Sequence, residues 1–139
     1  MKNKKSLQKA ILRAFGEDAD NTRLWVSIVR GTTDDVLNIL GEIDERSVQK
    51  KWSWSKIFKG GKARSPLTEA LEEERIDLIK PLVKAGAKWE AYETQLAAAL
   101  IVNYAQRSPQ SSDLAPLVAA CLNTNIDWRV GMFYEQKGE

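Results

Sequence analysis

The chain has 139 residues, 43% hydrophobic and 29% charged, a composition typical of a single globular domain over 1–139 and unlike a disordered segment. It contains one cysteine and no histidine, which excludes an internal disulfide, a zinc site of Cys and His ligands, and catalysis that depends on histidine. The net charge is only +2, yet residues 46–64 carry seven cations and no acid, so a concentrated basic segment lies within a mildly acidic body.

The first segment, 1–16, predicts an N-terminal cap helix. Within KKSLQKAILRAF (4–15), apolar residues recur at helical spacing, and Gly16 is a natural stop. The segment is basic but has no apolar run of the length that a signal peptide needs. No stretch of the chain approaches the roughly 20 apolar residues of a membrane span. We therefore expect a cytoplasmic protein that makes no use of a membrane.

Residues 22–45 predict the first pair of helices. An apolar stripe at helical spacing marks the first helix: Leu24, Trp25, Ile28 and Val29. Thr22 is its expected N-cap and Gly31 its expected end. A second helix follows, with Asp34 and Asp35 suited to its N-terminus. Trp25 lies on the apolar stripe, so we expect its side chain in the core.

Residues 46–64 break the helical pattern and predict an inserted finger loop, extended or hairpin-like, with one turn of helix near 55–59. The stretch KKWSWSKIFKGGK mixes cations with aromatic residues. Tryptophan beside cations is typical of binding hot spots. The predicted partner-binding residues are Lys50, Lys51, Trp52, Trp54, Lys56, Phe58 and Lys59. In the alternative interpretation, the tryptophans pack back onto the body and the lysines only keep the loop soluble.

Residues 65–91 predict the second pair of helices. Ser65 is the expected N-cap and Pro66 the first helical residue, where its missing N–H costs nothing. The first helix is expected to run through Glu74, and the second from Asp77 to Gly86.

A third pair is predicted over 92–128. Its first helix is expected to start at Thr94, and its second lies in DLAPLVAACLNTN, after a polar insertion near 102–112. Cys121 lies in this apolar run, so we expect a buried, inert thiol. The last residues, 129–139, are expected to form a C-terminal cap or tail.

Two segments of the chain repeat one another. DLIKPLVKAGAKW (77–89) and DLAPLVAACLNTNIDW (113–128) share an Asp-Leu start, a Pro-Leu-Val core and a closing Trp. Residues 65–89 resemble an ankyrin repeat. The residues that carry the resemblance are Ser65, Pro66, Leu67 and Thr68 at its start, Ala70, the pairs Leu78-Ile79 and Leu82-Val83, and Gly86-Ala87 at its end. Asn125-Ile126-Asp127 stands where the family has Gly-Ala-Asp, and asparagine tolerates the left-handed backbone required there.

This resemblance implies an all-α fold, an ankyrin-like solenoid of helical hairpins with helical end caps. Three departures from the family pattern stand out. Glu74 occupies a position where the family has a turn glycine, Thr68 replaces its histidine, and the spacing between units is irregular. A HEAT-like array or a plain helical bundle is the rival architecture. The acids Glu72, Glu73 and Glu74 fan around a helix, which is typical of a solvated face.

From the resemblance we expect a protein–protein interaction module that binds a partner with an acidic surface through a concave face and the 46–64 loop. A small binder without catalytic residues suggests an inhibitor, such as a bacterial immunity protein or a phage-encoded blocker of a host enzyme. We expect no enzyme activity, no cofactor, no metal, and a monomer or weak dimer. Two alternatives remain: a nucleic-acid binder that uses the basic, aromatic loop, and an enzyme that depends on converging carboxylates.

Overall fold

The computed structural model describes residues 19–53, 63–107 and 114–130. The described chain is mostly helical, which confirms the all-α prediction at the level of fold class. The first elements in chain order are α2 (Ala19–Arg30), α3 (Thr33–Leu40), α4 (Glu45–Gln49), β1 (Trp52–Ser53) and β2 (Ala63–Arg64). The remaining elements are α5 (Pro66–Glu72), the 3-10 helix η3 (Ile76–Leu78), α6 (Ile79–Lys84), α7 (Ala91–Arg107) and α8 (Leu114–Asn123).

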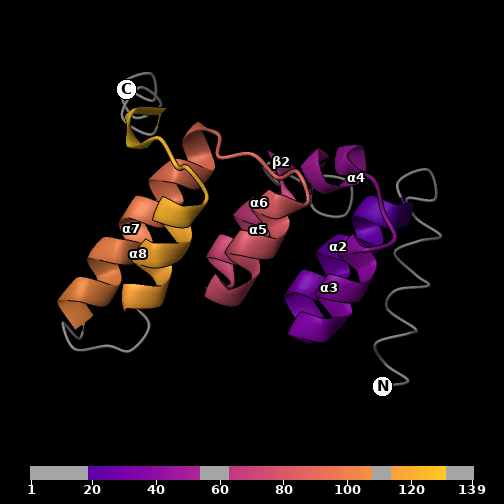
Figure 1. The fold of residues 1–139 in the computed structure, drawn as a ribbon, viewed down its shortest axis with the longest axis horizontal. Coiled ribbons are helices and arrows are strands. Elements are labelled where there is room, and N and C mark those ends of the chain that lie inside the picture. Colours follow the sequence, from indigo (N-terminus) through magenta and orange to yellow (C-terminus); the bar gives the residue numbers. More distant parts are fainter. Residues whose placement is uncertain (1–18, 54–62, 108–113, 131–139) are drawn as a thin grey trace.

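The helices form three pairs that lie side by side in one row (Figure 1). The pairs are α2 with α3, α5 with α6, and α7 with α8. Helix α5 packs against both α2 and α7, while α6 packs against α8 and α3 against η3. The turns within the first two pairs lie at one edge of the row, and α4 and β2 lie at the opposite edge (Figure 1).

A continuous apolar core runs through the three pairs. Its fully buried side chains come from all of them: Leu24, Ile28, Val36, Leu67, Leu71, Leu78, Leu82, Leu117 and Cys121. Trp25 is only 2% exposed, which confirms its predicted burial. Cys121 is fully buried as predicted, and burial raises the pKa of its thiol to about 11, so the thiol stays protonated at neutral pH.

The two tryptophans that close the repeated segments pack against this core. Trp89 donates a hydrogen bond from Nε1 to Thr124 Oγ1 at 2.9 Å, and so ties the end of the second pair to the end of α8. Trp128 is half-buried on the same core. Trp89 therefore packs where the second and third pairs meet.

Three helices end in the same type of cap, with a residue in the left-handed region after the last turn. These residues are Glu74 (φ 55°), Gly86 (φ 123°) and Asn125 (φ 60°). At each end, two backbone N–H groups fold back onto the carbonyls of the last turn, as in Arg75 N to Ala70 O at 2.8 Å. The left-handed backbone predicted at Asn125 is confirmed. Glu74 therefore has a left-handed backbone, a conformation that favours glycine.

Several predicted boundaries were wrong. Thr22 is not an N-cap but a buried residue inside α2, which begins at Ala19. The helix that starts at Pro66 ends at Glu72 instead of Glu74, because its left-handed cap follows at once. Helix α7 begins at Ala91, three residues before the expected start at Thr94, because the Thr94 N–H already bonds to the Glu90 carbonyl at 3.0 Å. The same helix extends to Arg107, into the predicted insertion.

The predicted finger loop also starts too early. Residues 46–49 belong to α4, which Asp44 caps by accepting a hydrogen bond from Ser47 N at 2.9 Å. The loop therefore begins only after Gln49. The predicted cap helix over 1–16, the turn near 55–59 and nearly all of 129–139 lie outside the described residues.

Candidate partner-binding site at the base of the hairpin

The two strands form the base of a hairpin between the first and second helix pairs. Trp52 pairs with Arg64 and Ser53 with Ala63 in antiparallel register. The segment between these strands is therefore closed at its root, as the hairpin-like interpretation of 46–64 predicts. Strand β2 runs directly into α5 through Ser65, which is the N-cap and accepts a hydrogen bond from Thr68 N.

Helix α4 is anchored to the helices on either side. Asn21 of α2 donates from Nδ2 to the carbonyls of Ser47 and Lys50, both at 2.9 Å. Gln49 donates from Nε2 to the Gly86 carbonyl, at the end of α6, at 2.8 Å. The root of the hairpin is thus fixed to the first and second pairs by hydrogen bonds that span 26 to 37 residues of sequence.

Only part of the predicted binding residues can be placed. Lys50 follows α4 as its C-cap and is exposed. Lys51 is half-exposed and forms an ion pair with Glu90 at 3.3 Å. Trp52 lies in β1, with its side chain outside the described part of the structure. The remaining predicted residues lie outside the described residues altogether: Trp54, Lys56, Phe58 and Lys59.

A partly buried ionic cluster lies at the base of the hairpin. Arg64 pairs with Glu69 at 3.2 Å and also with Glu72. Tyr92 of α7 donates its hydroxyl to Glu72 at 3.2 Å. The Glu69 side chain is only 4% exposed. Burial raises the pKa of Glu69 to about 6, although the hydrogen bond and positive charge of Arg64 oppose the shift.

A small cavity of about 190 Å³ lies beside this cluster, lined in part by Lys51, Glu90, Tyr92 and Glu93. Glu93 is only 2% exposed, and its Oε1 accepts a hydrogen bond from the Ser65 hydroxyl at 3.0 Å. Neither Glu69 nor Glu93 was predicted from the sequence as a residue of the site. The apolar neighbours of Glu69 in the sequence, Leu67, Ala70 and Leu71, could have predicted that this side chain is buried. The sequence around Glu93 contains no comparable pattern.

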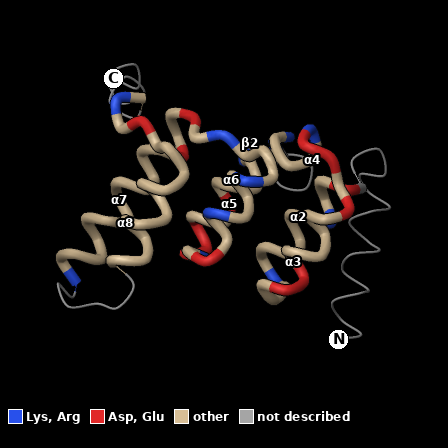
Figure 2. Tube along the Cα trace, in the orientation of Figure 1, with Lys and Arg blue, Asp and Glu red and all other residues tan. Residues whose placement is uncertain are grey.

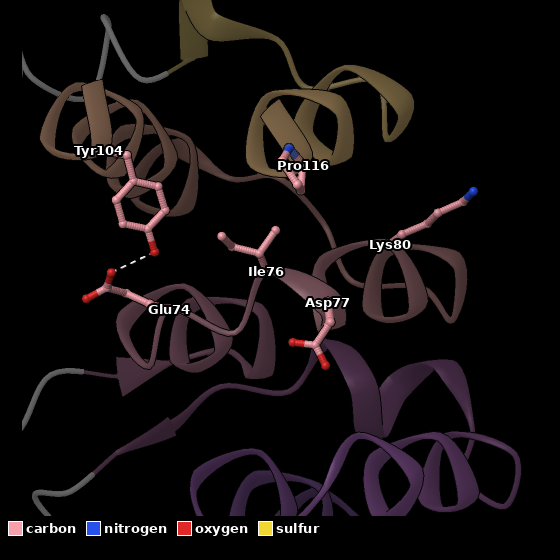
Figure 3. Close-up of a pocket in the computed structure, with 6 residues that line it drawn as sticks. All are labelled: Glu74, Ile76, Asp77, Lys80, Tyr104 and Pro116. Carbon is pink, nitrogen blue, oxygen red and sulfur yellow. Dashed lines mark hydrogen bonds between the residues drawn. The ribbon is translucent and has the colours of Figure 1, made fainter. Parts of the chain in front are cut away.

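A second and larger groove separates the second and third helix pairs (Figure 3). It measures about 470 Å³ and is lined by Glu74, Ile76, Asp77, Lys80, Tyr104 and Pro116. Tyr104 donates its hydroxyl to Glu74 at 2.7 Å (Figure 3), and Arg107 pairs with the same carboxylate at 3.3 Å. Asp77 accepts a hydrogen bond from the Thr33 hydroxyl. These polar groups mainly hold the units together.

Charged residues are distributed unevenly over the fold. In Figure 2, Lys and Arg lie beside Asp and Glu along the edge that carries α4 and β2, whereas α7 and α8 are almost free of charge. Within the described ranges, no group of three or more His, Cys, Asp or Glu residues is placed to hold a metal ion. None of the helices in those ranges has the length and apolar character needed to cross a membrane.

Comparisons with protein-family models, with curated proteins and with solved structures found no match to this chain.

Proposed function

We propose that the chain is an ankyrin-like stack of three helical hairpins that binds a partner protein and inhibits or neutralises it without catalysis. The hairpin between β1 and β2, together with the surface around its base, forms the grip. The row of pairs supports this architecture, since equivalent helices of successive units pack on one another. The recurring caps at Gly86 and Asn125, each followed three residues later by a tryptophan, support a repeat origin.

The observation that carries this function is the anchoring of the hairpin root. Asn21 and Gln49 hold α4 from both sides, and the strands close the loop immediately after it. A loop rich in cations and aromatic residues is thus presented from a fixed base. A fixed base reduces the ordering cost of association, so more of the contact energy contributes to affinity.

The charges around the base favour a protein partner over nucleic acid. Among the described cations of 46–64, Lys51 and Arg64 are paired with carboxylates of the body. The three carboxylates paired with these two cations, Glu69, Glu72 and Glu90, line the base itself. Phosphate groups approaching this surface meet like charges, which lowers affinity. A partner protein of mixed surface charge fits the hairpin base better, if the part of it that faces the loop is mainly acidic.

The test is affinity capture from the native host, with three variants beside the wild type. Trp52→Ala/Trp54→Ala and Lys50→Glu should each lose the captured protein while they keep wild-type circular dichroism. Lys80→Glu, the same charge reversal on the far groove, should retain it. Capture that survives both hairpin variants would place binding elsewhere, and recovery of nucleic acid alone would refute the proposal.

A further inference from the structure

The cavity beside the hairpin base contains a buried carboxylate that has no cation of its own. Glu93 is almost fully inaccessible, yet among the described residues no lysine or arginine lies within ion-pair distance of it. Its Oε1 accepts one hydrogen bond, from Ser65. No described residue donates a hydrogen bond to Oε2, and this oxygen is not among the fully buried atoms that lack a partner. A buried, ionised carboxylate is costly unless a cation or several hydrogen bonds satisfy it.

The charge balance around the cavity is negative. Arg64 already forms ion pairs with Glu69 and Glu72 in the neighbouring cluster, so it does not neutralise Glu93. Lys51 is the one cation among the described residues that line the cavity, and it pairs with Glu90; both side chains are half-exposed. An exposed pair of this kind is weak and exchanges readily. The cavity therefore contains a carboxylate that has no ion-pair partner among the described residues. A weak ion pair, between Lys51 and Glu90, spans the mouth of the cavity.

We propose that this cavity receives the guanidinium or ammonium group of an arginine or lysine side chain of the partner protein. This inference deepens the proposed function, on which it rests for the source of the side chain. A planar guanidinium presents several donors to Glu93, while Glu90 supplies a second carboxylate at the mouth. The Tyr92 ring and the Ser65 and Thr68 hydroxyls complete the lining. A volume of about 190 Å³ accommodates the end of one such side chain but not a folded element.

In this arrangement Lys51 acts as an internal competitor. Its ammonium group is bound to Glu90 at the mouth, so an incoming basic side chain must displace it. Removal of Lys51 should then strengthen binding of a small cationic probe, whereas removal of the Glu93 charge should weaken it. The two substitutions thus have opposite predicted signs, which a purely structural role for either residue does not produce.

The experiment is a titration of the isolated, isotope-labelled protein with N-acetyl-arginine amide, followed by NMR at the amides of Ser65, Thr68 and Glu93. N-acetyl-citrulline amide, with the same shape and no charge, should bind at least about tenfold more weakly. Glu93→Gln should weaken arginine-amide binding about tenfold, and Lys51→Met should tighten it about two- to fivefold. Glu73→Gln, a matched loss of one exposed acid, should leave it unchanged.

Equal binding of the citrulline probe, or no change in Glu93→Gln, would overturn the site. An equal loss of affinity for N-acetyl-arginine amide in Glu73→Gln would also overturn the site, because the loss would then depend only on the overall charge of the protein. Putrescine carries the same ammonium group as a free diamine, and tighter binding of putrescine than of N-acetyl-lysine amide would overturn the assignment to a side chain. If Glu93→Gln does not fold, Glu90→Gln tests the mouth of the cavity with the same expected loss. Because no partner is present, failure of this titration is distinct from failure of the capture experiment.

Discussion

Arg75 joins the first two helix pairs, and its replacement tests whether the pairs stabilise one another. Its Nη1 donates to three carbonyls at the C-terminal end of α2: Ile28 and Gly31 at 2.9 Å each and Ser27 at 3.3 Å. The last carbonyls of a helix lack intrahelical partners, although Ser27 O also accepts the Gly31 N–H at 2.7 Å. The guanidinium charge also lies where the helix dipole is negative. We therefore expect Arg75→Met, which keeps the stem but removes donors and charge, to weaken the contact between the pairs.

The magnitude follows from the donors. Nη1 carries two hydrogens, so the three contacts amount to two full hydrogen bonds. Each charge-assisted bond contributes about 1.5–3 kcal/mol, and Arg75 is half-buried, so water recovers part of that total when the side chain is lost. We expect the free energy of unfolding to fall by about 3 kcal/mol, a large share of the roughly 5–15 kcal/mol of a typical domain.

Urea unfolding followed by circular dichroism measures this loss, and hydrogen exchange locates it. In a row of units each pair depends on its neighbours, so amides of α2 should lose protection while those of α7 keep it. Arg23→Met is the matched control. Arg23 pairs with Asp20 and Glu42 on the surface, and its loss should cost less than about 1 kcal/mol. A loss below 1 kcal/mol for Arg75→Met, or uniform loss of protection, would refute the reasoning.

Three further predictions follow from single residues. Because burial raises the pKa of Glu69 from 4.5 to about 6, the native state binds more protons than the unfolded state in that interval. The contribution of Glu69 to the free energy of unfolding should therefore fall as pH rises from about 4.5 to about 6, by up to about 2 kcal/mol. Urea titrations across this range should show that Glu69→Gln removes this dependence of the free energy on pH. An unchanged dependence in the variant would contradict the pKa shift. Gly86→Ala should lower the free energy of unfolding by about 2 kcal/mol in thermal unfolding, since φ is +123° and the new Cβ would lie 2.4 Å from Glu45 Cγ. Gly41→Ala is the control and should be nearly neutral, because Gly41 has helical backbone angles and space for a Cβ. Equal losses in the two variants would contradict this explanation. In urea unfolding, Asn125→Ala should lower the free energy of unfolding by about 1 kcal/mol and Asn125→Gly by almost nothing, because only alanine is strained at φ 60°. Equal losses in the two variants would show that the side chain, and not the backbone, stabilises this turn.

The local features of the fold could be predicted from the sequence because their causes lie within a few residues. The Ser65-Pro66 start of α5, the stop at Gly86 and the left-handed Asn125 each depend on one turn of backbone. The same holds for the apolar stripe that buries Trp25. Helical spacing and capping chemistry are visible in the order of residues alone.

The features that were missed depend on distant partners. Helix α4 is short, and it is fixed by Asn21, which lies 26 residues before its acceptor Ser47. Arg75 bonds to carbonyls 44 to 48 residues away. Glu93 bonds to Ser65, which lies 28 residues before it. No local pattern encodes such contacts, so the cavity at the hairpin base could not be predicted, although the loop that it adjoins was.

The most direct test of the binding account is site-specific photo-crosslinking in the native host. A photoreactive amino acid replaces Lys50, at the root of the hairpin, or Asn38, an exposed residue of α3. We expect one protein, with an acidic surface, to be crosslinked from position 50 and not from position 38. Its yield should fall in Trp52→Ala/Trp54→Ala. The same protein crosslinked equally from both positions, or nucleic acid alone from position 50, would contradict this expectation.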